Sequence, residues 1–455
     1  MSFEKILKFL IGLFLFLLPW QTIWIFRESF LGGVKMEWWT EGVYATEILL
    51  WAIVFVFMWW YYKNFKFQIS NFKFRMTKDR IFVSAVLLFV IYCFVSRFWS
   101  LDSDLAMQQS LRILEAFLLF FVLWLGPLKK EDAIKWLVLG SILPCILGIW
   151  QFLMQSTFAS KWLGLALHPA WQAGTSVVAS DAIGRWLRAY GTFSHPNVFG
   201  GFLVIVLVCL IMNNGTWIME QKKSLRFVFH VLCSMFCVAL FFTFSRSAWI
   251  VAFIGLLVYW FIVWRQRLKD YKIKRLPVTS HQLLIIVYLV ILVVLFFPLI
   301  QTRLTSLSVT EMRSTDERVS EYSDAWKLFK KDPILGVGAG NYTKALWESN
   351  KWRPAWKIQP VHNAFVLFAV ESGVVGVGLL AFVVLTWIMD QRSWIKRRGQ
   401  FDVCSMFHVL CFVIIVSFDH YLYSSYTGLM LSALFFGLIS RKSDDKAISP
   451  QLIHF

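Results

Sequence analysis

Long apolar runs recur from one end of the chain to the other and are separated by short polar stretches. A helix needs about 20 apolar residues to cross roughly 30 Å of hydrocarbon, because it rises about 1.5 Å per residue. By this rule the pattern predicts about twelve membrane-spanning helices. The predicted spans lie near residues 6–26, 43–61, 81–96, 111–127, 132–153, 197–213, 226–243, 247–264, 282–300, 362–389, 404–418 and 423–440. We therefore expect an all-α polytopic membrane protein.

Composition supports this class. Of the 455 residues, 58% are hydrophobic and only 16% are charged, whereas about a quarter of a soluble domain is charged. Disorder, a collagen-like fibre and an ordinary soluble enzyme are excluded. The first run could be mistaken for a signal peptide, but it offers no small-residue cleavage site. Trp20 and Trp24 stand where small residues would be needed, so we expect this run to remain as the first span.

Lysine and arginine gather in alternate loops. Basic residues are frequent in 63–80, 129–130, 222–226, 265–275 and 392–398, and the short loops between these stretches contain few. Because cytoplasmic loops carry the excess of positive charge, both termini are expected in the cytoplasm. The net charge of +18 thus indicates membrane topology and not a nucleic-acid partner. The seven cysteines form no CxxC pair, so neither a disulfide framework nor a structural zinc site is indicated.

Two loops on the predicted outer side are long, and long loops without structure of their own are usually functional. The second contains a helix-like stretch, 317–331, followed by a Pro/Gly-rich stretch, 332–341. We therefore expect any chemistry on the outer face. The predicted organisation is spans in 1–153, a first long loop in 154–196, spans in 197–300, a second long loop in 301–361, spans in 362–440 and a polar tail in 441–455.

Polar residues that are costly in a membrane stand at the ends of several predicted spans. Arg246 lies in a short turn between two apolar runs, and an arginine at the bilayer centre costs about 2.5 kcal/mol or more unless it reaches water or a partner. One interpretation is that it extends to the lipid headgroups. The other is that its planar guanidinium binds the oxygens of a diphosphate.

Four motifs stand at these span ends, namely Gly191-Thr-Phe-x-His195-Pro-Asn197 preceded by Arg188, Ser245-Arg246, His362-Asn363, and Trp99-Ser100-x-Asp102 in an earlier loop. Together they resemble the motifs of the O-antigen ligase/polymerase family of membrane glycosyltransferases. The resemblance implies a fold of the GT-C glycosyltransferase type in the cytoplasmic (inner) membrane. It also implies a donor glycan linked to polyprenyl (undecaprenyl) diphosphate and a glycan or lipid-glycan acceptor, joined outside the cytoplasm.

The resemblance also implies roles for single residues. Arg188 and Arg246 would bind the carrier's diphosphate. Arg318 is a weaker third candidate, because Asp316, Glu317 and Glu321 could pair with it instead. His362 would be the general base, since a neutral imidazole accepts a proton near neutral pH, and nearby arginines are expected to lower its pKa.

Other polar residues are expected to support the site. The predicted supporting residues are Asn363, His195, Asn197 and Gly338, with His195 structural because it precedes a proline. Glu371 lies nine residues beyond the histidine, which places it on about the opposite helix face. We expect it to belong to a small-residue packing contact with Gly373 and Gly376. Asp419-His420 is the alternative acid/base pair.

No cofactor and no metal are predicted, because the expected outer face carries no HExxH motif, acidic metal pair or Cys/His cluster. The run Gly336-Val-Gly338-Ala-Gly340 follows no predicted strand, so it does not indicate a nucleotide loop. The expected reaction is one displacement with inversion at the anomeric carbon.

The acceptor stays open. It could be lipid A-core for a ligase, the growing glycan for a surface or exopolysaccharide polymerase, or a Ser/Thr residue for a protein O-oligosaccharyltransferase. The alternative from another class is a lipid-linked glycan flippase, which would need polar or broken helices at the membrane midplane.

Overall fold

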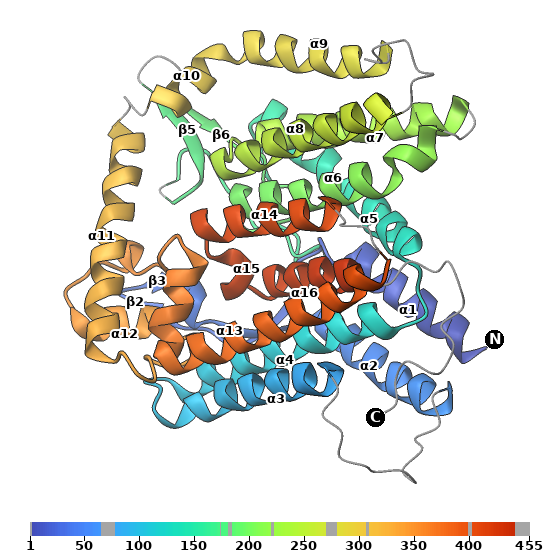
Figure 1. Cartoon of the computed structure of the whole chain (residues 1–455). Coiled ribbons are helices and arrows are strands. Elements are labelled where there is room, and N and C mark those ends of the chain that lie inside the picture. The colour runs from blue at the N-terminus through green and yellow to red at the C-terminus, as the bar shows by residue number, and fades with distance from the viewer. Residues whose placement is uncertain are drawn as a thin grey trace.

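The computed structural model describes residues 2–64, 78–172, 174–180, 184–219, 223–269, 280–305, 309–398 and 403–441. Helices dominate these residues, and the strands form three separate two-stranded ribbons (Figure 1). The ribbons pair β1 (Ile23–Arg27) with β4 (Glu41–Tyr44), β2 (Phe30–Leu31) with β3 (Val34–Lys35), and β5 (Val177–Ser180) with β6 (Gly184–Leu187). The expected helical class is confirmed. The predicted tail beyond Arg441 lies outside the described residues.

Helices occur at each predicted span. The first half of the chain contains α1 (Phe3–Leu17), α2 (Ala45–Asn64), α3 (Lys78–Val95), α4 (Ser103–Leu125), α5 (Lys130–Met154), α6 (Pro196–Met219) and α7 (Lys223–Phe242). The second half contains α8 (Arg246–Lys269), α9 (Ser280–Leu295), α10 (Phe297–Thr305), α11 (Val309–Lys331), α12 (Tyr342–Ser349), α13 (Ala364–Arg398), α14 (Val403–Phe418), α15 (Tyr421–Ser424) and α16 (Tyr426–Ser440). Short 3₁₀ helices lie at Glu37–Trp39, Ser96–Phe98 and Ala355–Lys357.

Five helices in the described part of the chain are long and apolar enough to cross a membrane. They are Ala45–Asn64, Arg80–Phe98, Ser103–Leu125, Lys130–Met154 and Ala364–Met389. Shorter apolar helices lie at Pro196–Leu210, Phe227–Phe242, Arg246–Val258, Val409–Phe418 and Tyr426–Ser440. Together they make this a multi-pass membrane protein, and five of the twelve predicted spans meet the full length requirement.

The first predicted span, 6–26, is wrong in its second half. α1 ends at Leu17, and residues 23–27 form strand β1. Pro19 follows two residues later, and a proline cannot donate the backbone hydrogen bond that would continue the helix. The apolar residues beyond the proline therefore pair with β4 instead of extending the helix.

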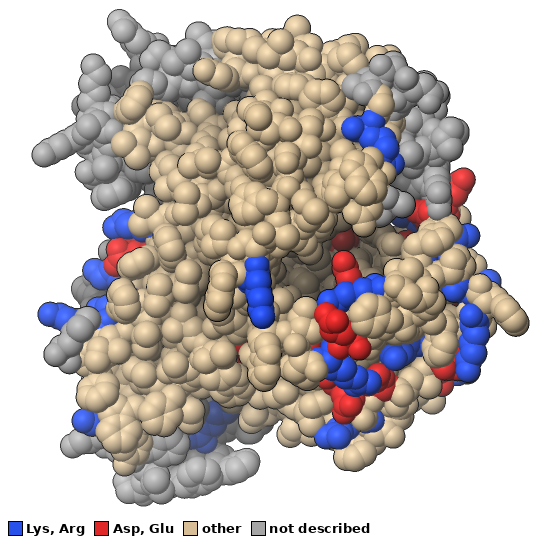
Figure 2. Space-filling model, turned by 180° about the vertical axis from the view of Figure 1, so that it is seen from behind, with Lys and Arg blue, Asp and Glu red and all other residues tan. Residues whose placement is uncertain are grey.

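The ribbons and the helices α11 and α12 lie at one end of the bundle, which we call the loop end. Figure 1 shows α11 running across the ends of the other helices, far from the N-terminus. A separate apolar cluster joins α11, α12 and α13, with Ala325, Tyr342 and Leu367 buried in it. Figure 2 shows charged side chains gathered around a hollow on one side of the molecule, a second group along the opposite edge, and few on the surface between them. The loop end is thus one of two polar regions that flank an apolar surface.

Candidate active site

The loop end brings together residues that are far apart in the sequence. His195 precedes α6, His362 and Asn363 precede α13, and Asp419 and His420 separate α14 from α15. Each of them stands at a helix end, where the chain leaves the apolar bundle. Helix ends position these side chains rigidly and leave them near the polar surface.

Arg188 follows β6 and is buried, with 3% of its surface exposed. Its guanidinium donates from Nε to the Thr243 carbonyl oxygen (2.6 Å), from Nη1 to Ser176 Oγ (2.6 Å) and from Nη2 to Asn197 Oδ1 (2.7 Å). Asn197 Nδ2 then donates to Asp419 Oδ2 at 3.0 Å. Arg188 therefore links the first long loop, the turn before α8 and the end of α14. Protein groups already accept from at least three of its five N–H donors.

Three histidines surround the carboxylate of Asp419. The backbone N–H of His420 donates to Asp419 Oδ1 at 2.9 Å. Burial would raise the pKa of Asp419, but the facing histidines and this hydrogen bond lower it. Burial, together with the charge of Arg188, lowers the pKa of His195 to about 3, and burial lowers that of His420 to about 4. A buried imidazole is held neutral in this way, so both rings are suited to a structural role.

His362 differs from these two histidines because it pairs with a carboxylate. Its Nδ1 lies 2.8 Å from Glu321 Oε2 on α11, and its backbone N–H donates to the same oxygen at 3.2 Å. Burial lowers the pKa of His362, but the hydrogen bond to Glu321 and the charges of Asp419 and Glu321 outweigh both burial and Arg318 and raise it above 6.5. Arg318 lowers this pKa as expected, but the carboxylates outweigh it, so the net shift is upward. With Nδ1 facing Glu321, the second ring nitrogen is the one able to accept a proton.

Asn363 fixes the backbone on which His362 stands. Its Oδ1 accepts from the backbone N–H of Val366 in the first turn of α13 (3.1 Å), as a helix-capping residue does. Its Nδ2 donates to Tyr322 on α11 (3.2 Å) and to the Ser417 carbonyl at the end of α14 (3.1 Å). The supporting position predicted for Asn363 thus has a geometric basis in three helices.

The other two predicted arginines are less enclosed than Arg188. Arg246 is the first residue of α8 and is half-buried. Arg303 on α10, which the sequence did not suggest, donates from Nε to the carbonyl of Phe244 in the same turn (3.2 Å). Arg318 lies three residues before Glu321 on α11, where side chains share a face. Within the described residues Arg318 forms no hydrogen bond or ion pair, because Glu321 contacts His362 instead.

The Pro/Gly-rich stretch forms a tight turn against the motif that precedes α4. Gly338 has a φ of +94°, and a side chain there would collide with Ser100. Asn341 Oδ1 accepts from the backbone N–H of Asp102 (2.8 Å), and Asn341 Nδ2 donates to the Asp102 carbonyl (3.1 Å). The two motifs therefore form one structural unit, which explains the predicted supporting position of Gly338.

Glu371 secures the same turn, and its expected role in a small-residue packing contact is wrong. Its carboxylate accepts from the backbone N–H groups of Gly340 (2.9 Å) and Tyr342 (3.3 Å) and from the Tyr423 hydroxyl (2.7 Å). Two residues after Glu371, Gly373 interrupts α13 with a φ of 61°. A side chain there would collide with the carbonyl of Ile334. Gly373 therefore marks the point at which the turn interrupts the helix.

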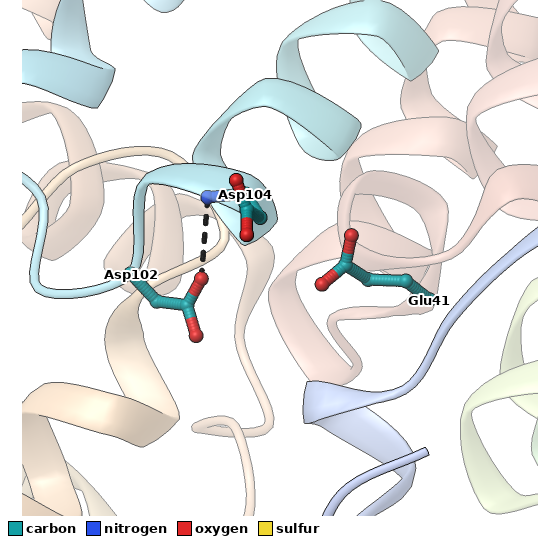
Figure 3. A group of neighbouring side chains, drawn as sticks. All are labelled: Glu41, Asp102 and Asp104. Carbon is teal, nitrogen blue, oxygen red and sulfur yellow. Dashed lines mark hydrogen bonds between the residues drawn. The ribbon is translucent and has the colours of Figure 1, made fainter. Parts of the chain in front are cut away.

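Three carboxylates from β4 and the start of α4 form the acidic group drawn in Figure 3, namely Glu41, Asp102 and Asp104. The expectation that this face carries no acidic pair is wrong, because it overlooked Asp102-Ser-Asp104. One oxygen from each lies within 4.8 Å of the others, a spacing that suits a metal ion. Arg27 binds all three, with contacts of 2.5 Å to Glu41, 3.0 Å to Asp104 and 3.3 Å to Asp102. The guanidinium supplies the positive charge that a metal would supply, so the group fits an ion-pair network better than a cofactor site.

A cavity of about 600 Å³ lies beside Glu321, between α11, α12 and the segment that leads to His362. Its lining is rich in acidic and aromatic side chains, and consists of Asp316, Glu317, Ser320, Glu321, Asp324, Tyr342, Leu346, Arg353, Trp356, Lys357 and Gln359. Glu321 lines the cavity and contacts His362, whereas His362 is not itself among the lining residues.

The structure therefore unites most of the predicted site residues and adds one that sequence reasoning missed. Arg188, Asn197, Asp419 and the histidines form one connected group, and Arg318 approaches it from α11. Glu321 was considered only as a partner for Arg318. Its spacing of three from that arginine on a predicted helix was the available signal, since both then share a face.

Residues 230–383 match the family model described as O-Antigen ligase. The matched segment runs from α7 into α13 and contains Arg246, Arg318, Gly338 and His362. The predicted resemblance is confirmed for this segment. No curated protein matches the chain.

Proposed function

We propose, from the premise that the chain carries an O-antigen ligase family domain at residues 230–383, that it transfers a glycan from a polyprenyl diphosphate carrier to an acceptor hydroxyl at the loop end. The family match supports a ligase- or polymerase-like membrane enzyme. Donor, acceptor and residue roles are our proposal. We place the loop end outside the cytoplasmic membrane, with both termini inside, because the predicted basic loops belong to the opposite side.

The observation that carries the proposal is the pair formed by His362 and Glu321 beside the cavity. In the proposed reaction the acceptor oxygen forms a bond to the anomeric carbon as the bond from that carbon to the diphosphate oxygen breaks. The hydroxyl proton passes to Nε2 of His362, and polyprenyl diphosphate departs with the electron pair. Attack opposite the leaving group inverts the anomeric configuration. Glu321 holds Nδ1 and stabilises the imidazolium, and such a positioned base accelerates a reaction by about 10²–10⁴-fold.

Arginines stabilise the departing diphosphate in this proposal, and charge stabilisation of this kind is a large term in catalysis. Arg246 and Arg318 are the arginines we assign to the diphosphate, because both are half-buried, Arg318 faces His362, and Arg246 follows the turn whose Thr243 carbonyl accepts from Arg188. Arg188 contributes chiefly its charge, since three of its N–H donors are bound to protein. It also holds Asn197, and His195 supports Asn197 by accepting its backbone N–H at 3.1 Å.

A transfer assay with purified protein in lipid nanodiscs tests the proposal. The donor is a synthetic polyprenyl diphosphate oligosaccharide, and the readout is release of polyprenyl diphosphate together with formation of the new glycosidic bond. His362→Ala should abolish both products and leave binding of the donor lipid intact. Transfer that survives in His362→Ala would refute the assigned base. Lipid translocation without transfer in the unaltered protein would favour the flippase.

A further inference from the structure

The beginning of the first long loop, residues 158–167, is apolar and exposed. Its large exposed side chains are Phe158, Trp162, Leu163 and Leu167, and Trp162 is 84% exposed. Lys161 is the one charged residue of this stretch. Proteins rarely expose contiguous apolar patches to water, and such patches mark contacts with other proteins or with membranes. The proposed reaction uses none of these side chains, so their exposure needs another explanation.

The lipid-facing side of α5 leads directly to this stretch. Exposed apolar side chains recur on α5 every three or four residues, as on one face of a helix, and they are Leu139, Leu143, Ile146, Trp150 and Leu153. Because α5 is long and apolar enough to cross a membrane, this stripe faces lipid. About 20 residues counted from Lys135, its last charged residue, end at Gln155, so the hydrocarbon ends where α5 ends. Phe158 then packs on Trp150, with ring centres 6.0 Å apart, and continues the lipid-facing surface.

The packing of α1 on α5 gives a second, independent measure of depth. A side chain at Gly12 would meet Trp136, and a side chain at Gly140 would meet the carbonyl of Phe16. Both contacts advance by four residues on each helix, so α1 and α5 run side by side in the same direction. Phe16 is therefore level with Gly140 along α5.

Chain lengths then limit how far residue 21 can lie from the membrane. Met154, the last residue of α5, follows Gly140 by fourteen residues, which is about 21 Å along the helix. Gln21 follows Phe16 by five residues, and five extended residues reach about 18 Å at most. Gln21 therefore does not extend beyond the end of α5.

The exposed stretch is docked on this same segment. A side chain at Gly164 would collide with the carbonyl of Gln21, and the Thr22 hydroxyl donates to the carbonyl of Trp162 at 2.9 Å. Residues 158–167 thus lie at the depth of the last turns of α5 and not above them. β1, which begins directly after Thr22, exposes alternate side chains, namely Trp24 and Phe26.

We infer that residues 158–167 form a membrane-inserted turn, which lies in the phospholipid leaflet at the loop end beside α5. Lipid covers the apolar patch, because the patch continues a lipid-facing helix at the depth where the hydrocarbon ends. Tryptophan is favoured at that boundary, and Lys161 is long enough to extend to the headgroups. Directly beyond the turn, His168 stacks on Tyr190 with ring centres 4.1 Å apart. The turn therefore ties the segment that carries Arg188 to the membrane surface.

Nitroxide labels on the full chain in nanodiscs test the inference without any transfer reaction. A label at Trp162→Cys is compared with one at Leu153→Cys on the lipid-facing stripe and with one at Glu348→Cys on α12, where Glu348 pairs with Lys351 at the charged surface. Collision rates are measured with oxygen, which concentrates in lipid, and with a water-soluble nickel chelate. The unaltered protein, labelled in parallel, corrects for the native cysteines. The oxygen-to-nickel ratio at Trp162→Cys should match that at Leu153→Cys and exceed that at Glu348→Cys several-fold.

Two results of this measurement would overturn the inference. A ratio at Trp162→Cys equal to that at Glu348→Cys would place the turn in water. A label shielded from both reagents would place the turn against protein, and loss of the shielding in nanodiscs that hold a single chain would identify a second copy as the partner.

A pair of substitutions at one position provides a test that needs no label. Trp162→Asp should lower the melting temperature in nanodiscs, because a carboxylate within the membrane is costly. Trp162→Phe keeps an apolar ring and should leave the melting temperature unchanged. At a position exposed to water both substitutions would be nearly neutral, so equal melting temperatures of the two variants would contradict the membrane-inserted turn.

Discussion

Arg188 and Arg318 approach the same group of histidines from opposite regions, and their surroundings differ completely. Arg188 is buried and donates to a backbone carbonyl, a serine and an asparagine. Arg318 is half-buried on α11 and forms no hydrogen bond or ion pair among the described residues. The region around Arg188 is filled with hydrogen bonds between protein groups, and the region around α11 borders a cavity. Residue type alone therefore does not show which arginine maintains the structure and which is available to a ligand.

The histidines repeat this contrast. Burial lowers the pKa values of His195 and His420, the former together with Arg188, so neither ring readily takes up a proton. Despite burial, Glu321 and Asp419 raise the pKa of His362, so its ring has the higher proton affinity. A better base at an accessible position is what the proposed chemistry needs. The region around Arg188 thus stabilises the backbone, and the region around α11 carries the proposed reaction.

Replacing the histidines one at a time should give the largest difference in transfer rate between the two regions. His362→Ala is expected to lower the transfer rate by about 10²–10⁴-fold, the usual contribution of a positioned base. His420→Ala should cost less than about tenfold, because His420 is buried and bonded to Ser424 at 2.7 Å. Single-turnover transfer with labelled donor measures both. Equal losses in the two variants would remove the distinction between the regions.

Replacing the two arginines should separate stability from donor binding. Arg188→Ala leaves three acceptors without their donor, and since each loss costs about 1–3 kcal/mol, we expect a clearly lower melting temperature and folded yield. Arg318→Ala should change unfolding free energy by less than about 0.5 kcal/mol, as a partly exposed site does, and should weaken donor binding. Thermal unfolding in detergent and donor titration measure these effects. A stable Arg188→Ala protein would contradict the structural role.

A glycine pair tests how far the reacting region depends on the tight turn. Gly338→Ala places a side chain at a φ of +94° against Ser100, which should destabilise the protein by about 1–3 kcal/mol. Gly378→Ala in α13 is the control, because nothing lies within 4 Å of its added carbon, and it should be neutral or slightly stabilising. The melting temperatures of the two purified variants test whether the turn requires glycine at this position. Matching values would show that the turn does not require glycine.

Chelation should have the smallest effect. Because Arg27 already neutralises the group of Glu41, Asp102 and Asp104, EDTA is expected to leave the transfer rate unchanged. Burial would raise the pKa of Asp102, but a backbone hydrogen bond and the charges of Arg27 and Lys344 lower it, which marks a compensated carboxylate. A loss of activity that magnesium or calcium restores would contradict metal independence.

The apolar pattern was sufficient to locate the helices, and the comparison of the two regions shows why it was not sufficient for the site. Hydrophobic runs report helix positions directly, but the run broken by Pro19 was misjudged in its second half, and the predicted spans 282–300 and 423–440 are each divided between two helices. The spacing of motifs indicated His362, Asn197 and Gly338 as neighbours of helix ends. It could not show that Glu321, 41 residues away from His362 along the chain, folds back on it, because that contact depends on how α11 lies across the bundle.

The sign of the pKa shift at His362 could not be obtained from the sequence for the same reason. Counting nearby arginines predicted a lowered pKa, since positive charge disfavours the protonated ring. The contact with Glu321 and the charge of Asp419 reverse that result, and neither residue is a sequence neighbour of His362. Long-range carboxylates decided the outcome, and only the fold reveals them.

The pH dependence of transfer in the unaltered protein and in Glu321→Gln tests the central claim most directly. A general base must be neutral to act, so the rate should rise with pH through a midpoint above 6.5, the direction in which Glu321 and Asp419 shift the pKa of His362. Glu321→Gln removes the carboxylate that stabilises the imidazolium, so the midpoint should move to lower pH and the maximal rate should fall by about tenfold, part of the usual contribution of a positioned base. The same midpoint in both proteins would show that His362 and Glu321 do not act as a pair.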